Sequence, residues 1–176
     1  VAARNAGWEV LGVEPGSGQV EICRTIHGME MVHGLLPDAK LEDGRVEVVS
    51  YRQVLEHIHD PIAELQEAHR ILAEDGLLLI EVPHYGGQRY RMGRLRAAFK
   101  VFKPYWHSLN VPEHLYYVTP ETLTRLLDRA GFEPGFLRTS GKARRSRTIV
   151  RRLYESARDR LQFGNKLRVI ARPRPN

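Results

Sequence analysis

Cysteine is almost missing from this sequence, since Cys23 is the only one among 176 residues. Intramolecular disulfides and a metal site built from several cysteines are therefore excluded. Long apolar runs are missing too, because the longest, around residues 77–82, falls far short of the roughly 20 residues that a membrane-spanning helix needs. The apolar and charged fractions are ordinary for a globular domain. We therefore expect a single domain over residues 1–176, in a protein of the cytoplasm.

Acidic residues are scarce in two stretches, and each stretch is strongly basic as a result. Residues 138–176 hold 13 lysines and arginines but only two acidic residues, so the net charge of +6 arises in this tail. Residues 84–112 contain no acidic residue, and their basic residues are Arg89, Arg91, Arg94, Arg96, Lys100 and Lys103. Such stretches attract phosphates, nucleic acid or anionic membranes, although most are simply solvated. Tyr154 is the only aromatic residue between 143 and 160, whereas nucleic-acid modules usually add stacking groups.

Strand-like and helix-like segments alternate along the chain, which is typical of an α/β fold. The predicted strands cover residues 8–14, 29–33, 46–50, 77–82, 132–139 and 167–171. The predicted helices cover residues 19–27, 61–75, 119–130 and 143–163, and residues 1–7 look like the last turns of another helix. We interpret residues 84–111 as an insertion that could cover a substrate, and residues 142–164 as a basic helical insertion.

Four segments carry a resemblance to a known family. They are Trp8 to Pro15, the loop segment Tyr51 to Pro61 with its Val-Leu-Glu-His-x-x-Asp-Pro pattern, Gly76 to Pro83, and Pro112 to Leu123. In order and spacing they resemble the class I S-adenosylmethionine-dependent methyltransferases, chiefly the small-molecule branch, over about residues 1–141. The resemblance implies a Rossmann-like doubly wound α/β sheet with S-adenosylmethionine as cofactor. It also implies methyl transfer to an oxygen, nitrogen or carbon atom of a small molecule.

The start of the sequence departs from that family. A complete member opens with a strand, a glycine-rich loop and a helix whose amino end receives the cofactor. Here residues 1–7 resemble the end of that helix, with Gly7 as its stop signal. We therefore expect an N-terminally truncated domain that lacks the first strand and the loop. Such a fragment should bind the cofactor poorly, because the strands at 8–14 and 46–50 lose the neighbour that they share.

The resemblance also implies which residues bind the cofactor. Glu14, which ends a predicted strand, matches the acidic residue that accepts hydrogen bonds from both ribose hydroxyls. Pro15 follows it, and Leu36 lies where the family surrounds the adenine. Tyr51 and Gln53, at the end of another predicted strand, would line the methionine part of the cofactor.

Catalytic candidates are fewer and weaker. His57 could remove a proton from the acceptor, because histidine titrates near neutral pH, but Glu56 and His57 could instead only hold the loop. His114 lies in the segment where relatives build substrate pockets, and so do other polar and aromatic residues. These are His84, Tyr85, Trp106, His107, Glu113 and Tyr117. A dedicated base is optional, since the cofactor supplies the electrophile.

No metal site is expected from the sequence. Some quinone-pathway members resemble the segment at 53–57 but use two glutamates and a histidine as metal ligands. Gln53 replaces the first of those glutamates here, and no third ligand is evident beside His57 and His59.

Two alternatives to a small-molecule enzyme stay open. One is a non-catalytic methyltransferase-like protein that uses its basic tail to hold nucleic acid or a partner. The other is an enzyme for a lipid-linked or quinone-like substrate that docks on a membrane surface through residues 89–106, where basic and apolar residues alternate.

Overall fold

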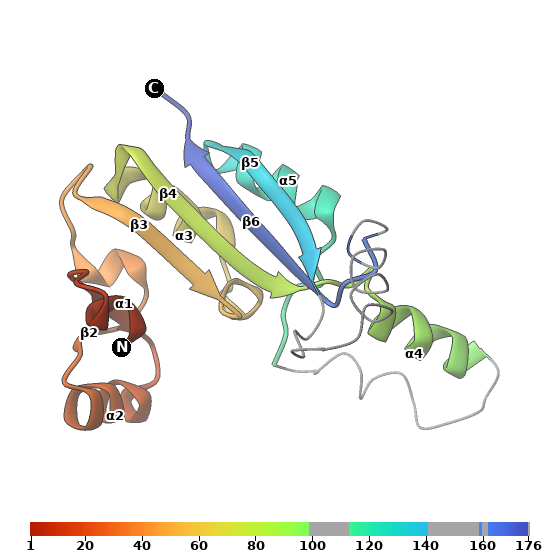
Figure 1. Ribbon diagram of the computed structural model, residues 1–176, viewed down its shortest axis with the longest axis horizontal. Helices are drawn as coiled ribbons and strands as arrows, with labels where there is room; N and C mark the ends of the chain where they lie inside the picture. Colours follow the sequence, from red (N-terminus) through yellow and green to blue (C-terminus); the bar gives the residue numbers. More distant parts are fainter. Residues whose placement is uncertain (99–112, 141–158, 160–161, 176) are drawn as a thin grey trace.

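The computed structural model describes residues 1–98, 113–140, 159 and 162–175, and its strands form two sheets (Figure 1). The smaller sheet pairs β1 (Leu11–Glu14) and β2 (Glu30–His33) in parallel, and α2 (Ser17–His27) connects them. The larger sheet has the order β3-β4-β6-β5. Its strands are β3 (Val46–Arg52), β4 (Leu72–Pro83), β5 (Phe132–Ser140) and β6 (Lys166–Pro173). The predicted strands are thus confirmed as elements, with shifted ends.

The larger sheet is mixed. β3 and β4 run parallel and are connected through α3 (Pro61–Ile71), whereas β6 runs antiparallel to both β4 and β5. Parallel neighbours need such a crossover, and their carboxyl ends then lie at the same edge of the sheet. This edge is where ligands bind in open α/β sheets.

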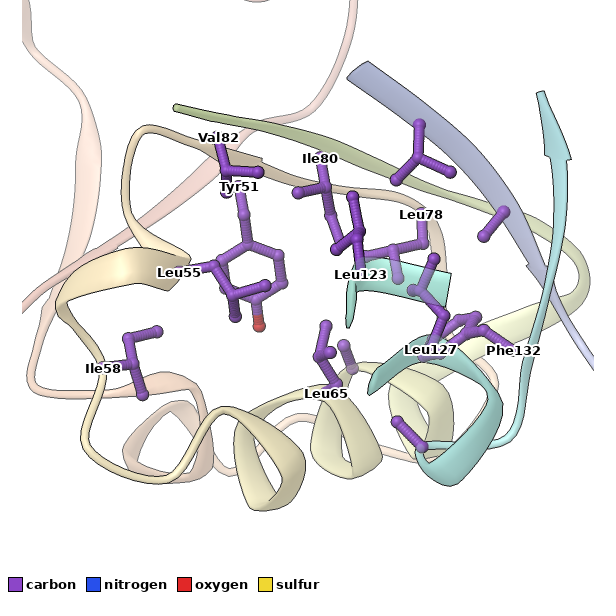
Figure 2. Close-up of a cluster of buried hydrophobic side chains, with 14 of the residues drawn as sticks. Tyr51, Leu55, Ile58, Leu65, Leu78, Ile80, Val82, Leu123, Leu127 and Phe132 are labelled. Carbon is purple, nitrogen blue, oxygen red and sulfur yellow. The ribbon is translucent and has the colours of Figure 1, made fainter. Parts of the chain in front are cut away.

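The hydrophobic core lies between one face of the larger sheet and two helices, α3 and α5 (Pro120–Arg129). Figure 2 shows Tyr51, Leu78 and Ile80 directed from the sheet toward Leu65 and Leu127 of the helices. All five side chains are almost fully buried. Burying one such side chain contributes roughly 1.5–3 kcal/mol, so this layer contributes strongly to the stability of the larger sheet.

Both core helices begin where the sequence predicts. The side chain of Asp60 accepts hydrogen bonds from the backbone N–H of Ile62 and Ala63, and Pro61 occupies the first helical position of α3. Thr119 caps α5 in the same way by accepting from the N–H of Thr122. Caps of this kind are typically worth about 1 kcal/mol each.

The predicted end of α3 at residue 75 is wrong. The helix ends at Ile71, and Leu72 already pairs with Val46 as the first residue of β4. A register irregularity follows, after which Val48 pairs with Leu77. The helical spacing of apolar residues extends through Leu72, but this side chain is buried equally well from a strand, so periodicity alone does not locate the boundary.

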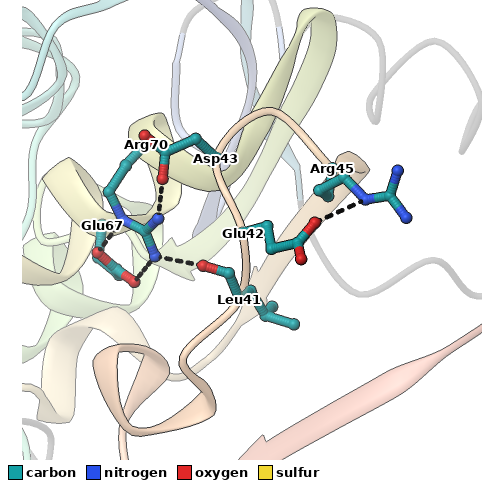
Figure 3. A network of polar contacts seen from close by, with 6 residues as sticks. All are labelled: Leu41, Glu42, Asp43, Arg45, Glu67 and Arg70. Carbon is teal, nitrogen blue, oxygen red and sulfur yellow. Dashed lines mark hydrogen bonds and ion pairs between the residues drawn. The ribbon is translucent and has the colours of Figure 1, made fainter.

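Arg70 fastens the loop between β2 and β3 to α3 (Figure 3). Its guanidinium donates to both carboxylate oxygens of Glu67, at 2.9 and 2.6 Å, and to the backbone oxygen of Leu41 at 2.7 Å. It also forms an ion pair with Asp43. These contacts set where the chain enters β3.

The described residues leave an open edge on β1 and another on β3. β1 pairs with β2 and β3 pairs with β4, and no described strand lies between β1 and β3.

Three expectations concern segments at the ends and in the insertions. A short helix, α1 (Ala2–Asn5), precedes Gly7, whose φ of 92° suits the predicted stop. Within the insertion at 84–111, the structure describes α4 (Gln88–Ala98), and the rest lies outside the described residues. The basic helix expected at 142–164 also lies almost wholly outside them. None of the helices described is long and apolar enough to cross a membrane.

Two phenylalanines of β5 provide a matched test of the core. Phe132 is fully buried, whereas Phe136 is 50% exposed on the opposite side of the strand. We expect Phe132→Ala to lower the free energy of unfolding by about 3–5 kcal/mol, and Phe136→Ala by less than about 0.5 kcal/mol. Urea unfolding followed by circular dichroism measures both, and equal losses would contradict this packing.

Two glutamates of α3 should give opposite pH dependences. Burial raises the pKa of Glu64 above its ordinary 4.5, so Glu64 destabilises the fold increasingly as pH rises from about 4.5 through its folded-state pKa. The hydrogen bond from Arg70 lowers the pKa of Glu67, so its contribution is present above 4.5 and is lost in acid. We therefore expect Glu64→Gln to gain stability relative to the wild type between pH 4.5 and 8.

Glu67→Gln is the control on the same helix, and it should lose up to about 1 kcal/mol at pH 7, as for other partly exposed ion pairs. This loss should disappear as pH falls through the folded-state pKa of Glu67. Urea unfolding at pH 4, 6 and 8 separates the two variants. A common pH dependence would show that the two carboxylates are not in the environments described.

Candidate functional site

Glu14 ends β1 with its carboxylate held by the following turn. Its Oε1 accepts a hydrogen bond of 2.8 Å from the N–H of Gly16, the N-cap residue that precedes α2. A Cβ at position 16 would lie 2.9 Å from that oxygen and 2.4 Å from Oε1 of Gln19, so any larger residue there would displace these side chains. No described residue is recorded as a partner of Oε2. One carboxylate oxygen is thus fixed, and the other is free to accept a hydroxyl group.

Of the other two residues expected near Glu14 and the adenine, one is exposed and one has its side chain buried in the core. Pro15 is exposed, and its carbonyl contacts Nε2 of His33 at 2.9 Å. Leu36 opens a 3-10 helix, η1 (Leu36–Ala39), and its side chain is buried in the core. Leu35 beside it is 43% exposed, with its N–H bound to the carboxylate of Asp38 at 2.7 Å. An apolar contact in this loop would therefore come from Leu35 and not from the side chain of Leu36.

Tyr51 and Gln53 occupy the carboxyl end of β3. The Tyr51 side chain points into the core and donates to Glu64 at 3.2 Å, and burial raises the pKa of its phenol. Gln53 has a left-handed backbone with φ of 58°, and its N–H and its side-chain amide both donate to the carbonyl of Glu81, at 2.7 and 3.1 Å. The side chain of Tyr51 therefore cannot line a ligand at this edge, whereas its backbone can.

Glu56 and His57 lie in the next turn, the 3-10 helix η2 (Leu55–His57). Nδ1 of His57 is 2.7 Å from the carbonyl oxygen of Glu113. Because a carbonyl can only accept, this contact places the proton of the neutral ring on Nδ1. Nε2 then has a free lone pair, and it lies 3.9 Å from Oε1 of Glu56.

The segment 113–118 lies against this turn and against the end of β4. Leu115 and Tyr116 donate their N–H groups to the backbone oxygen of Glu56, at 2.9 and 3.3 Å. The hydroxyl of Tyr116 donates to the carbonyl of His59 at 2.6 Å. At the other end, the N–H of Tyr85 donates to the carbonyl of Val118 at 2.8 Å. Residues far apart in the sequence are therefore held at one edge of the sheet.

The fold brings the two predicted histidines together. The ring centroids of His57 and His114 are 4.9 Å apart in an edge-to-face arrangement. Glu56 beside them is 1% exposed, and burial raises the pKa of its carboxyl. Burial, and the neighbouring His57, also lower the pKa of His114. Burial thus favours the neutral forms of Glu56 and His114.

Aromatic residues cover the carboxyl end of β4. The ring of Tyr85 lies 5.5 Å from those of Tyr90 and Tyr117, and Arg94 stacks over it at 5.4 Å. His84 is buried, its Nδ1 contacts the carbonyl of Gly164 at 2.8 Å, and burial lowers its pKa. Glu113 and Tyr117 join this edge as expected, whereas Trp106 and His107 lie outside the described residues.

The sequence analysis missed two residues at this edge. One is Tyr90, which is buried beside Tyr85. It lies in residues 84–111, which were interpreted from the sequence as an insertion without a role for Tyr90. The other is Glu81, which binds Lys166 at 2.5 Å and Arg168 at 2.6 Å. Burial alone would raise the pKa of Glu81, but these two cations hold it below its usual value. A single charge inside an apolar strand was the signal that could have identified it.

A hollow lined by His69, Arg129 and Arg174 lies elsewhere, where α5 ends and β6 ends. β6 is antiparallel to β4, so this is the amino end of β4. The hollow therefore takes no part in the site described above.

Comparison with known proteins agrees with this architecture. A family model described as a methyltransferase domain matches residues 1–134. The chain is 29% identical over 134 residues to a ubiquinone biosynthesis O-methyltransferase of Ruegeria pomeroyi. The match covers 73% of this chain and 52% of the relative. It is 30% identical over 105 residues to a probable S-adenosylmethionine-dependent methyltransferase of Mycolicibacterium smegmatis, covering 60% and 35%. The chain thus spans about half, or less, of the length of these relatives.

Solved structures share the fold at lower identity. A possible histamine N-methyltransferase of Thermotoga maritima superposes with a TM-score of 0.64 at 20% identity, covering 92% of this chain and 72% of that one. A methyltransferase of Archaeoglobus fulgidus gives a TM-score of 0.65 at 16% identity, covering 97% and 79%. With the family model matching most of the sequence, the chain belongs to the class I S-adenosylmethionine-dependent methyltransferase family.

Proposed function

We propose that this protein transfers the methyl group of S-adenosylmethionine to a small-molecule acceptor. Family membership supports this proposal, and the arrangement of Glu14 is the observation that carries it. A carboxylate at the end of a parallel strand, with one oxygen fixed by a turn and the other free, suits the vicinal hydroxyls of a ribose.

Other residues would complete the cofactor site. The exposed side chain of Leu35 would contact the adenine, close to the predicted Pro15 and Leu36. The backbone of Tyr51 and the residue Gln53 would lie along the methionine part of the cofactor. Both are at the carboxyl end of β3, which has an open edge. When bound, the cofactor supplies an electrophilic methyl group on a positively charged sulfur.

The chain itself would then position the acceptor, exclude water and hold a proton where one is released. His57 is oriented by the carbonyl of Glu113 and keeps a free lone pair on Nε2. That lone pair faces Glu56, so we assign His57 chiefly to holding the segment 113–118 in place. The aromatic rings of Tyr85 and Tyr117 would form a wall of the acceptor pocket.

We also propose that the open edges of β1 and β3 share a strand that lies outside the described residues. Each edge presents backbone groups that would otherwise be left unpaired, which is unfavourable in a buried sheet. Without that strand, the chain should bind the cofactor weakly.

Calorimetric titration with S-adenosylhomocysteine tests the cofactor site. The titration uses the present chain and a version that includes any residues preceding Val1 in its gene. We expect the longer protein to bind more tightly, and Glu14→Ala to weaken its binding by about 10- to 100-fold, as for loss of hydrogen bonds to a charged group. Glu30→Ala is the matched control, because Glu30 is an exposed carboxylate at the opposite end of the same small sheet.

The outcomes discriminate between the hypotheses. Equal effects of the two alanine variants would remove Glu14 from the site. If neither protein binds S-adenosylhomocysteine, the hypothesis that the protein is a methyltransferase fails. Salt-dependent retention of nucleic acid would then favour a protein that works through its basic tail.

A further inference from the structure

We infer that Glu56, His57 and His114 form a binding site for a zinc-like transition-metal ion. Each residue offers one ligand atom, and these atoms lie within 4.8 Å of one another. The inference is independent of the proposed methyl transfer, because it rests on this cluster alone.

The spacing is close to what a metal ion needs. Zinc binds histidine nitrogen and carboxylate oxygen at about 2.0–2.2 Å, so two ligand atoms of one tetrahedral ion are about 3.3–3.6 Å apart. Oε1 of Glu56 and Nε2 of His57 are 3.9 Å apart, which is a few tenths of an ångström longer than this separation. The remaining separations are at most 4.8 Å and would have to shorten by side-chain rotation when the ion binds.

The polar atoms of the cluster lack other partners. Both carboxylate oxygens of Glu56 and Nδ1 of His114 are buried, and none has a hydrogen-bond partner among the described residues. Buried polar groups without partners are rare in native proteins, because each retains its full desolvation penalty. A cation bound to Glu56 and His114 would offset much of that penalty.

His57 has the tautomer that a metal ligand requires. Its Nδ1 contacts the carbonyl of Glu113, so the neutral ring presents a lone pair at Nε2. Metal-binding histidines generally donate their second N–H to a carbonyl or carboxylate in this way. The hydrogen bonds from Leu115 and Tyr116 to the backbone of Glu56 fix the distance between the two segments.

This ligand set differs from the glutamate-rich one of the quinone-pathway proteins. The side chain of Gln53 is not available as a ligand, because its amide donates a hydrogen bond to the carbonyl of Glu81. The third ligand comes instead from the segment 113–118, which the fold places against η2. For this reason the sequence beside His57 showed no third ligand.

Two imidazoles and one carboxylate favour zinc and its neighbours over magnesium and calcium, which prefer oxygen ligands. Because Glu56 is buried, the ion would have a structural role: it would cross-link the segment 113–118 to the turn after β3. The two segments are already in contact, so the ion would strengthen an arrangement that exists without it.

Metal titration of the purified chain tests the inference. After treatment with EDTA and dialysis, the chain is titrated calorimetrically with Zn²⁺ and, separately, with Mg²⁺. Visible absorption on adding Co²⁺ reports the coordination directly. We expect one equivalent of Zn²⁺ with a raised melting temperature, a Co²⁺ spectrum of low coordination number, and no response to Mg²⁺. Failure to bind one equivalent of Zn²⁺ would overturn the inference.

Variants locate the ion. Glu56→Gln and His114→Ala should each weaken Zn²⁺ binding by more than about 100-fold, because each removes a ligand and not merely an outer partner. His59→Ala is the matched control, since His59 is an exposed histidine of the same loop, and it should bind normally. Melting of the metal-free variants verifies that they fold, and Glu56→Gln should fold well because its amide is neutral. Unchanged zinc binding by both ligand variants would place the ion on other histidines and overturn the inference.

Discussion

The packing of α3 and α5 on one face of the larger sheet is the constraint on which the site depends. α3 connects two parallel strands, and its burial against Leu78 and Ile80 holds the carboxyl ends of β3 and β4 at the same edge. The turn at Gln53 and η2 follow one strand, and His84 follows the other. α5 begins directly after the segment 113–118, so its packing holds that segment near the same edge.

Three buried glutamates near this layer are stabilised in different ways. Glu81 has Lys166 and Arg168 as partners and stays charged. Among the described residues, Glu64 has only neutral donors, the hydroxyl of Tyr51 and the N–H of Leu36, and burial raises its pKa. Glu56 has no hydrogen-bond partner for its carboxylate among the described residues. Burial is common to all three, so the available partners decide their charge.

Local signals in the sequence located much of the fold. Asp60 with Pro61, and Thr119 with Pro120, marked helix starts because capping is decided by neighbouring residues. The end of α3 could not be found in this way, because Leu72 is buried in either conformation. His57 and His114 were singled out separately, but their contact depends on long-range backbone hydrogen bonds that no local pattern reports. The inward direction of Leu36 and Tyr51 likewise depends on where α3 packs.

The open edge of β1 affects how long its backbone amides resist exchange with solvent. β4 and β6 have a strand on each side, so their N–H groups are shared between neighbours and shielded by the core. β1 is four residues long with one neighbour, and much of its surroundings is exposed. Deuterium uptake would therefore be faster in β1 than in β4 and β6, and the acidic residue at the end of β1 would lie in the less protected of the two described sheets.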